Sequence, residues 1–184
     1  MSGGGCAAGV VTVNAVRVVR FFSLLLVGLA LGAGLAHLFA LPNKMTLPGD
    51  VYLMVQQIYS GWALLDVLAV GGLGTLGVLA VLVRQRPRTF LLTLAAFLSM
   101  VAAQAVLWIL SFPADRATEG WTMLPPDWPI LRDQWEYSHA VGAGLELVAF
   151  VALIASVVLR ERPTPPQDGQ YGKRHMLLKF MSVH

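Results

Sequence analysis

Four long runs of apolar residues divide the chain, and each is long enough to cross a membrane as a helix. A helix needs roughly 20 apolar residues to span the hydrocarbon core of a bilayer. The runs occupy approximately residues 18–40, 61–83, 89–112 and 137–159. We therefore predict an all-α fold, an integral membrane four-helix bundle over residues 18–160, preceded by a flexible N-terminal segment at 1–17 and followed by a cytoplasmic tail at 161–184.

The composition indicates a lipid environment. Hydrophobic residues make up 57% of the 184 residues and charged residues only 12%, against about a quarter charged in a typical soluble domain. The formal net charge of +3 is too small to indicate a nucleic-acid partner. Cys6 is the only cysteine, which excludes an intramolecular disulfide and a cysteine metal cluster. We therefore predict the lipid bilayer as a partner and no nucleic-acid binding.

The Lys and Arg residues outside the spans predict the orientation, because cytoplasmic loops retain positive charge during membrane insertion. Ten of them precede the first span or lie in its first turn, join the second to the third, or follow the fourth: Arg17, Arg20, Arg84, Arg86, Arg88, Arg160, Arg162, Lys173, Arg174 and Lys179. The other two loops hold only three: Lys44, Arg116 and Arg132. We therefore predict a multi-pass protein of the cell membrane, a bacterial inner membrane, with both termini cytoplasmic.

The predicted loop between the third and fourth spans, residues 113–136, is rich in tryptophan and proline. Trp121, Trp128 and Trp135 are too many aromatic residues for a solvated linker. Four prolines argue against one continuous helix through this loop: Pro113, Pro125, Pro126 and Pro129. We predict that the loop folds back as a cap over the outer end of the bundle, while aromatic residues at the span ends fit an interfacial belt.

Polar side chains interrupt all four apolar spans: His37, Asp66, Gln104, His139 and Glu146. Such groups are costly in a bilayer and normally face a bundle interior, a partner or a water-filled cavity. On the fourth span, Glu136, His139 and Glu146 follow one helical face. The sequence therefore predicts a polar site in the bundle interior, toward the outer, periplasmic leaflet.

Three explanations of this site stay open. The carboxylates could pair with histidines only to hold the helices together, or the group could bind a substrate or a proton. The third explanation is a metal, because Glu136 and His139 have the Glu-x-x-His spacing of carboxylate-bridged metal sites. Its ligands, for copper or iron, would be His37, Asp66, His139 and Glu146. Two histidines on different helices could instead ligate a haem.

Two stretches of the chain carry a family resemblance. The first, LPNKMTLPGDVYLMVQQIYSGWALLD, has a proline-asparagine pair after the first span and a glutamine-rich segment before the second. The second, WPILRDQWEYSHAVGAGLELVAF, opens the last span with a tryptophan and a polar stretch. Both resemble the anthrone oxygenase-like family of small four-helix membrane proteins. The resemblance covers about residues 18–160 and implies the same four-helix topology.

This resemblance also implies a function. Characterised relatives convert anthrones to anthraquinones, which implies a membrane-embedded oxidoreductase or oxygenase-like protein acting on a lipophilic aromatic or quinol-type substrate. We expect His139 to be the general base, Glu136 or Glu146 to orient its ring and Arg132 to bind the developing oxyanion. The expected substrate-binding residues are Trp135, Asn43, Gln56 and Gln104.

A non-catalytic role is the alternative. Glycines are dense in the second span and recur in the first and fourth, and small residues let membrane helices approach closely. The chain would then be an accessory subunit of a larger membrane complex, or a homo-oligomer. The basic and apolar residues of the tail would lie on the anionic inner leaflet.

Overall fold

The computed structural model describes residues 4–159 of the chain, and the predicted cytoplasmic tail at 161–184 lies outside them. The elements are α1 (Gly4–Lys44), α2 (Gly49–Gln56), the 3-10 turns η1 (Gln57–Tyr59) and η2 (Trp62–Leu65), α3 (Asp66–Val83), α4 (Pro87–Val106), the π-helical turn η3 (Leu107–Ser111), α5 (Phe112–Ala117) and α6 (Trp128–Val158). No strand occurs among the described residues, so the predicted all-α fold is confirmed there.

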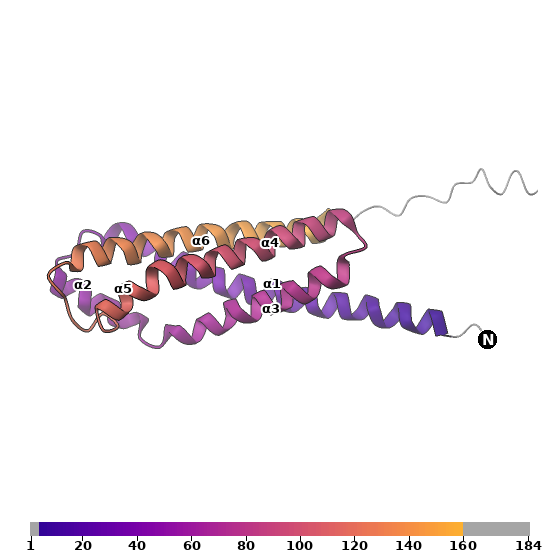
Figure 1. Ribbon diagram of the computed structural model, residues 1–184, viewed down its shortest axis with the longest axis horizontal. Helices are drawn as coiled ribbons and strands as arrows, with labels where there is room; N and C mark the ends of the chain where they lie inside the picture. The colour runs from indigo at the N-terminus through magenta and orange to yellow at the C-terminus, as the bar shows by residue number, and fades with distance from the viewer. Residues whose placement is uncertain (1–3, 160–184) are drawn as a thin grey trace, which may run out of the picture.

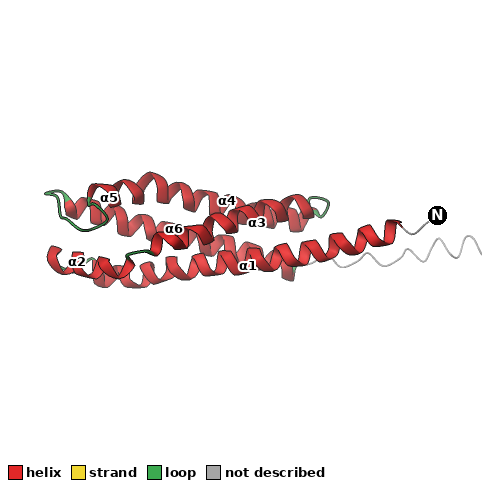
Figure 2. Cartoon of the chain, turned by 90° about the horizontal axis from the view of Figure 1, so that it is seen from below, coloured by secondary structure: helices red, strands yellow, loops and turns green. Residues whose placement is uncertain are grey.

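Four stretches of helix are long and apolar enough to cross a membrane, as predicted: Val13–Lys44, Asp66–Val83, Pro87–Ala117 and Trp128–Val158. In the elongated bundle they form, α1 contacts α3 and α6, and α4 contacts the same two helices from the other side (Figures 1 and 2). Each long helix therefore has two neighbours, and the bundle encloses a central axis.

Small and branched apolar side chains fill the middle of this bundle. The buried cluster comprises Val27, Ala30, Ala69, Leu76, Leu79, Val83, Ala96, Met100, Ala149 and Leu153. Gly28 lies on the edge of this packing, since a Cβ there would approach the Phe150 ring to 3.3 Å. Close packing of small residues is typical of membrane helices.

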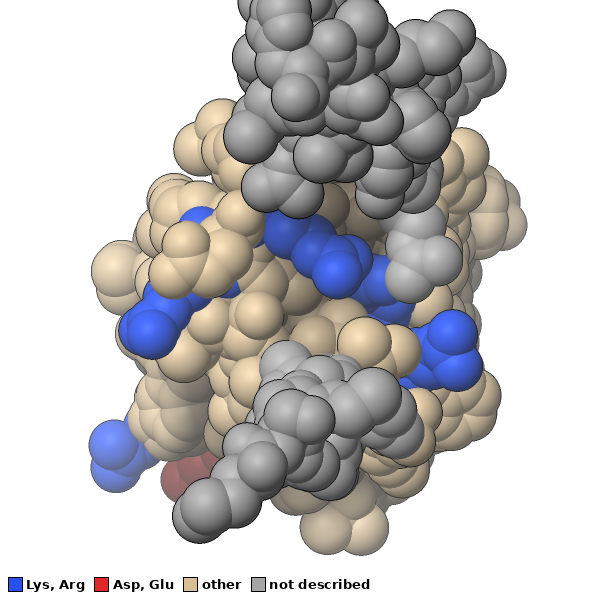
Figure 3. Space-filling view, turned by 90° about the vertical axis from the view of Figure 1, so that its right-hand side faces the viewer, with Lys and Arg blue, Asp and Glu red and all other residues tan. Residues whose placement is uncertain are grey.

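The two ends of the bundle differ in charge. At one end, which we call the basic end, α1 begins, α3 turns into α4 and α6 finishes (Figure 1). Lys and Arg side chains gather on that end, and little acidic surface is visible there (Figure 3). At the opposite end, which we call the loop end, lie α2, α5 and the connection 118–127.

Helices α1 and α6 are longer than the apolar runs predicted. The described part of α1 includes residues 4–17, which the sequence assigned to a flexible segment, and it continues through Pro42 to Lys44. Helix α6 begins at Trp128 because Pro129 occupies its first turn, where the missing N–H costs no hydrogen bond. Trp128 and Trp135 therefore lie on α6, and Trp121 alone of the three tryptophans lies in the connection 118–127.

The third span is not a uniform α-helix. After Val106 the backbone makes a π-helical turn, in which the N–H of Phe112 bonds to the carbonyl of Leu107, and α5 then continues to Ala117. The side chain of Gln134 on α6 donates to the Leu110 carbonyl at 2.7 Å, so a carbonyl of the wider turn is satisfied from a neighbouring helix. The hydrogen bond from α6 thus helps to hold the π turn in place.

Candidate functional site

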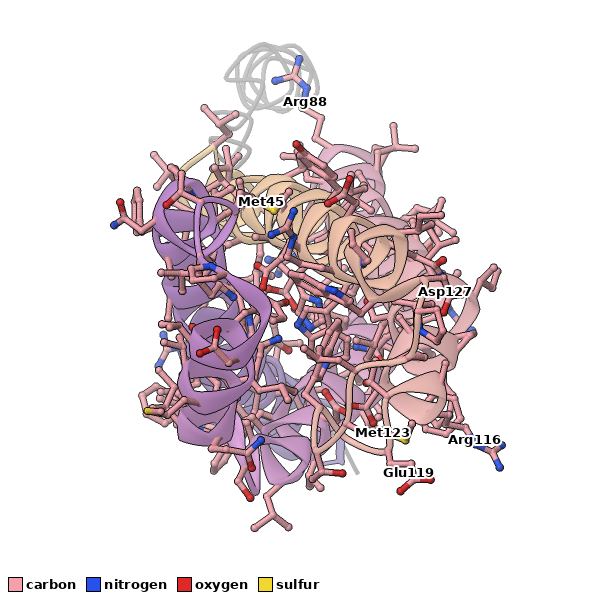
Figure 4. All side chains as sticks on the ribbon, turned by 90° about the vertical axis from the view of Figure 1, so that its left-hand side faces the viewer. Met45, Arg88, Arg116, Glu119, Met123 and Asp127 are labelled. Atoms are coloured by element: carbon pink, nitrogen blue, oxygen red, sulfur yellow. The ribbon has the colours of Figure 1, made fainter. Side chains whose placement is uncertain are left out.

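A cavity of about 560 Å³ lies between the four helices at the loop end. Its wall is formed by residues from α1, the end of α2, the 3-10 turns, α3, α4, the π turn, α5, the connection 118–127 and α6. Its aromatic side chains are Tyr59, Trp62, Trp108, Phe112, Trp121 and Trp135. Seen from this end, Arg116 and Glu119 point outward, away from the bundle axis (Figure 4). The cavity has the size and mixed apolar and polar lining of a small-molecule site.

Two histidines, one from the first long helix and one from the last, meet in this cavity. His37 of α1 and His139 of α6 stack with ring centroids 4.5 Å apart and planes inclined by 28°. Tyr59 stacks on His37 at 4.1 Å and 22°, and Trp135 lies 4.3 Å from His139. The two predicted histidines therefore do come together, inside a stack of aromatic rings.

The neighbours of each histidine fix which nitrogen carries the proton. Nδ1 of His139 lies 2.8 Å from the backbone carbonyl of Trp135, and because a carbonyl only accepts, Nδ1 is the donor. Nδ1 of His37 lies 3.5 Å from Nζ of Lys44, and because an ammonium only donates, this Nδ1 is the acceptor. In the neutral rings, Nε2 of His139 is then an acceptor and Nε2 of His37 a donor.

A buried hydrogen-bonded network stands behind His37. Nζ of Lys44 lies 2.7 Å from Oε1 of Glu136, and the two side chains are only 3% and 0% exposed. The Tyr52 hydroxyl donates to the same oxygen at 2.8 Å, and Nε2 of Gln56 donates to that hydroxyl at 2.8 Å. Burial and the Glu136 carboxylate raise the pKa of Tyr52, so its hydroxyl stays protonated.

Two serines join the π turn to α6 beside His139. Ser138 donates to the Trp135 carbonyl at 2.9 Å, so the 2.6 Å bond between Ser111 and Ser138 has Ser111 as donor. The Ser111 oxygen also lies 3.5 Å from Nδ1 of His139. These contacts fix the first turns of α6 against the π turn and hold the His139 ring in one orientation.

The structure brings together most of the predicted site residues. The cavity wall contains His37, Gln56, Asp66, Gln104, Trp135, His139 and Glu146. Glu136 lies behind the wall, where it bonds Lys44 and Tyr52 and not the His139 ring. Asn43 is exposed on the last turn of α1. Arg132 lies over the Trp128 ring at 5.1 Å and donates to the Leu47 carbonyl at 3.5 Å.

The predicted metal ligands do not form one cluster. Among the described residues, no three His, Cys, Asp or Glu side chains are placed to hold a metal ion. Asp66 and Glu146 line the same cavity as the histidine pair, but Glu146 follows His139 by seven residues, about 10 Å along α6. A copper, iron or haem site therefore stays a prediction from the sequence.

Several site residues were not predicted: Lys44, Tyr52, Tyr59, Ser111 and Ser138. Lys44 had a signal in the sequence, because it follows His37 by seven residues and so shares its helical face. The serines had none, since their pairing depends on the π turn.

Comparisons with protein-family models, with curated proteins and with solved structures give no match.

Proposed function

We propose that this chain is a membrane-embedded, oxygenase-like oxidoreductase acting on a lipophilic aromatic or quinol-type substrate. The observation that carries the proposal is the stacked pair of His37 and His139 inside an aromatic-lined cavity between membrane-length helices. A flat apolar substrate would fit against the tryptophans, which also keep water from the reacting atoms.

His139 is the proposed base. Its Nδ1 is occupied by the Trp135 carbonyl, so Nε2 is free to take a proton from an activated methylene or hydroxyl of the substrate. His37 supplies a donor at Nε2 for the oxygen on which negative charge develops. With dioxygen as oxidant, a methylene becomes a carbonyl and one water is released. Arg132, the oxyanion ligand expected from the sequence, stays a prediction because it does not line the cavity.

The proposal includes an orientation. The basic end would face the cytoplasm and the loop end the periplasm, as positive charge at one end of the bundle supports (Figure 3). Residues 118–127 would then cap the cavity. Trp121, which is 2% exposed and packs on Tyr52 and Trp135, supports this part of the proposal.

A topology measurement tests the orientation. We expect a fluorescent protein fused after residue 159 to fluoresce, because it would lie in the cytoplasm, and alkaline phosphatase at the same position to be inactive. We expect alkaline phosphatase inserted at Glu119 to be active, because it would lie in the periplasm. A fusion of each reporter at the reciprocal position serves as the control. Phosphatase activity from the fusion after residue 159 would contradict the orientation while leaving the cavity unaffected.

An oxygen-uptake measurement tests the activity. We expect the purified chain in lipid nanodiscs to consume one dioxygen for each anthrone converted to anthraquinone, faster than empty nanodiscs do. Uptake no faster than in empty nanodiscs would contradict the proposal. If other subunits co-purified with such an inactive preparation, the accessory-subunit role would be favoured instead.

A further inference from the structure

The half of the cavity nearer the basic end has chemistry that the histidine pair does not use. We propose that this half binds the cationic group of an aromatic amine, with Glu146 and Asp66 as its counterions. The inference rests on the proposed function only because both proposals place a ligand in the same cavity. It adds to that function a substrate class, an aromatic molecule with a protonated amine.

The charge on the cavity wall is of one sign. Three carboxylates line the cavity, on Asp66, Asp115 and Glu146, and no Lys or Arg does so among the described residues. The nearby ammonium of Lys44 is held by Glu136 behind the wall. A cavity with one sign of charge and walls of low dielectric concentrates ligands of the opposite sign. The cavity is therefore matched to a cation.

Glu146 is the residue that most needs a partner. Its Oε2 is buried and accepts no hydrogen bond, although an ionisable group within a membrane span is costly unless it serves a partner or a site. Gly34 of α1 provides the space for it, because a Cβ at that position would lie 2.6 Å from the same oxygen. The bundle thus accommodates this side chain at the cavity wall without giving that oxygen a hydrogen-bond donor.

Other buried polar groups of the same cavity also lack partners. Gln56 and Trp121 are only 4% and 2% exposed, yet Oε1 of the first and Nε1 of the second make no hydrogen bond. Native proteins leave few such groups unsatisfied, so each needs an explanation, and a ligand in the cavity would provide one. Trp121 is held with a positive φ of 59°, a conformation that costs energy and clusters at ligand sites.

The shape and walls of the cavity select an organic cation over an inorganic one. A volume of about 560 Å³ suits a drug-sized molecule and greatly exceeds a metal ion. Trp62 and Trp108 lie on the wall with Asp66 and Glu146, and tryptophan faces attract organic cations. The aromatic body would extend from the carboxylates toward the histidine pair, about 10 Å along α6.

A pair of matched probes tests the inference. In nanodiscs, with binding to empty nanodiscs subtracted, we expect 2-(1-naphthyl)ethylammonium to bind at least about tenfold more tightly than the neutral 2-(1-naphthyl)ethanol. Glu146→Gln should remove this preference and leave the affinity for the alcohol unchanged. Glu119→Gln, at an exposed carboxylate that points away from the bundle (Figure 4), should change neither affinity.

Three results would overturn the inference: equal affinity of the wild-type chain for the two probes, no binding of the amine, or full amine binding by folded Glu146→Gln. If Glu146→Gln fails to fold, Asp66→Asn at the exposed first residue of α3 takes its place, and an unchanged amine preference then counts against the inference. Anthrone turnover in the same preparations separates the two proposals, because neutral anthrone does not need the carboxylates. Turnover without amine binding contradicts only this inference, and amine binding without turnover contradicts only the proposed oxidation.

Discussion

Replacing Lys44 with methionine is expected to lower the free energy of unfolding by about 3–5 kcal/mol. Methionine keeps the length and apolar stem of the side chain but removes the ammonium. Glu136, whose side chain is 0% exposed, would keep its charge and lose its nearest counterion at 2.7 Å. Within the described residues, the Tyr52 hydroxyl would remain as its only hydrogen-bond donor. An uncompensated buried carboxylate is among the most destabilising single changes in a folded protein.

Equilibrium unfolding in mixed detergent micelles would measure this loss. The double variant Lys44→Met/Glu136→Gln should recover most of it, because the second change removes the unpaired charge. Arg132→Met is a matched control, since the Arg132–Asp133 pair is long at 3.5 Å and its carboxylate is 52% exposed. We expect it to cost less than about 1 kcal/mol. If Lys44→Met cost no more than Arg132→Met, the ion pair would not stabilise the bundle as described.

Replacing His139 with glutamine is expected to lower kcat/KM of the proposed oxidation by a factor of about 10²–10⁴. Glutamine can still donate to the Trp135 carbonyl from its amide, so the contact that orients residue 139 is kept in kind. It cannot accept a proton at the position of Nε2, because an amide is not a base in water. The loss should therefore fall on proton removal and not on folding.

Steady-state oxygen uptake with anthrone, together with the unfolding midpoint, would separate these effects. Thr93→Ala is the control, because Thr93 is fully buried in α4, bonds only its own helix at Thr89 and does not line the cavity. We expect its kcat/KM to stay within about threefold of the wild-type value. A His139→Gln variant that folds and also stays within this range would exclude His139 as the base.

The fold was largely predictable because the length of each apolar run shows directly that a helix of those residues can span a membrane. All four spans appear where the sequence placed them, and the second span ends at Val83 as predicted, but several of the other ends differ. Helices α1 and α6 continue beyond the apolar runs into polar sequence. This polar sequence is helical instead of forming a loop, because its charged residues Glu136 and Lys44 pair with each other inside the bundle. The four prolines of residues 113–136 predicted that no continuous helix runs through this segment, and the helix is indeed interrupted at 118–127. Pro129 itself lies in the first turn of α6, where proline is compatible with helix.

The candidate site was predictable only in part. Helical spacing placed Glu136 and His139 on one face, which is correct, and suggested that the carboxylate orients the imidazole, whereas the ring bonds the Trp135 carbonyl and Glu136 bonds Lys44. Residue spacing determines which side chains share a face but not which side chain of another helix reaches them. A hydrogen bond to a backbone carbonyl cannot be predicted from residue types, because every residue has a carbonyl.

The π-helical turn at Leu107–Ser111 sets the rotational register of the rest of the third span. Its i to i+5 bond holds one more residue than an α-helical turn would. Without that residue, every position from Ser111 onward would be rotated by about 100° about the helix axis. Ser111 could then no longer reach Ser138 and His139. The extra residue of the turn thus accounts for the serine contact, and deleting one residue from Leu107–Ser111 is expected to remove it.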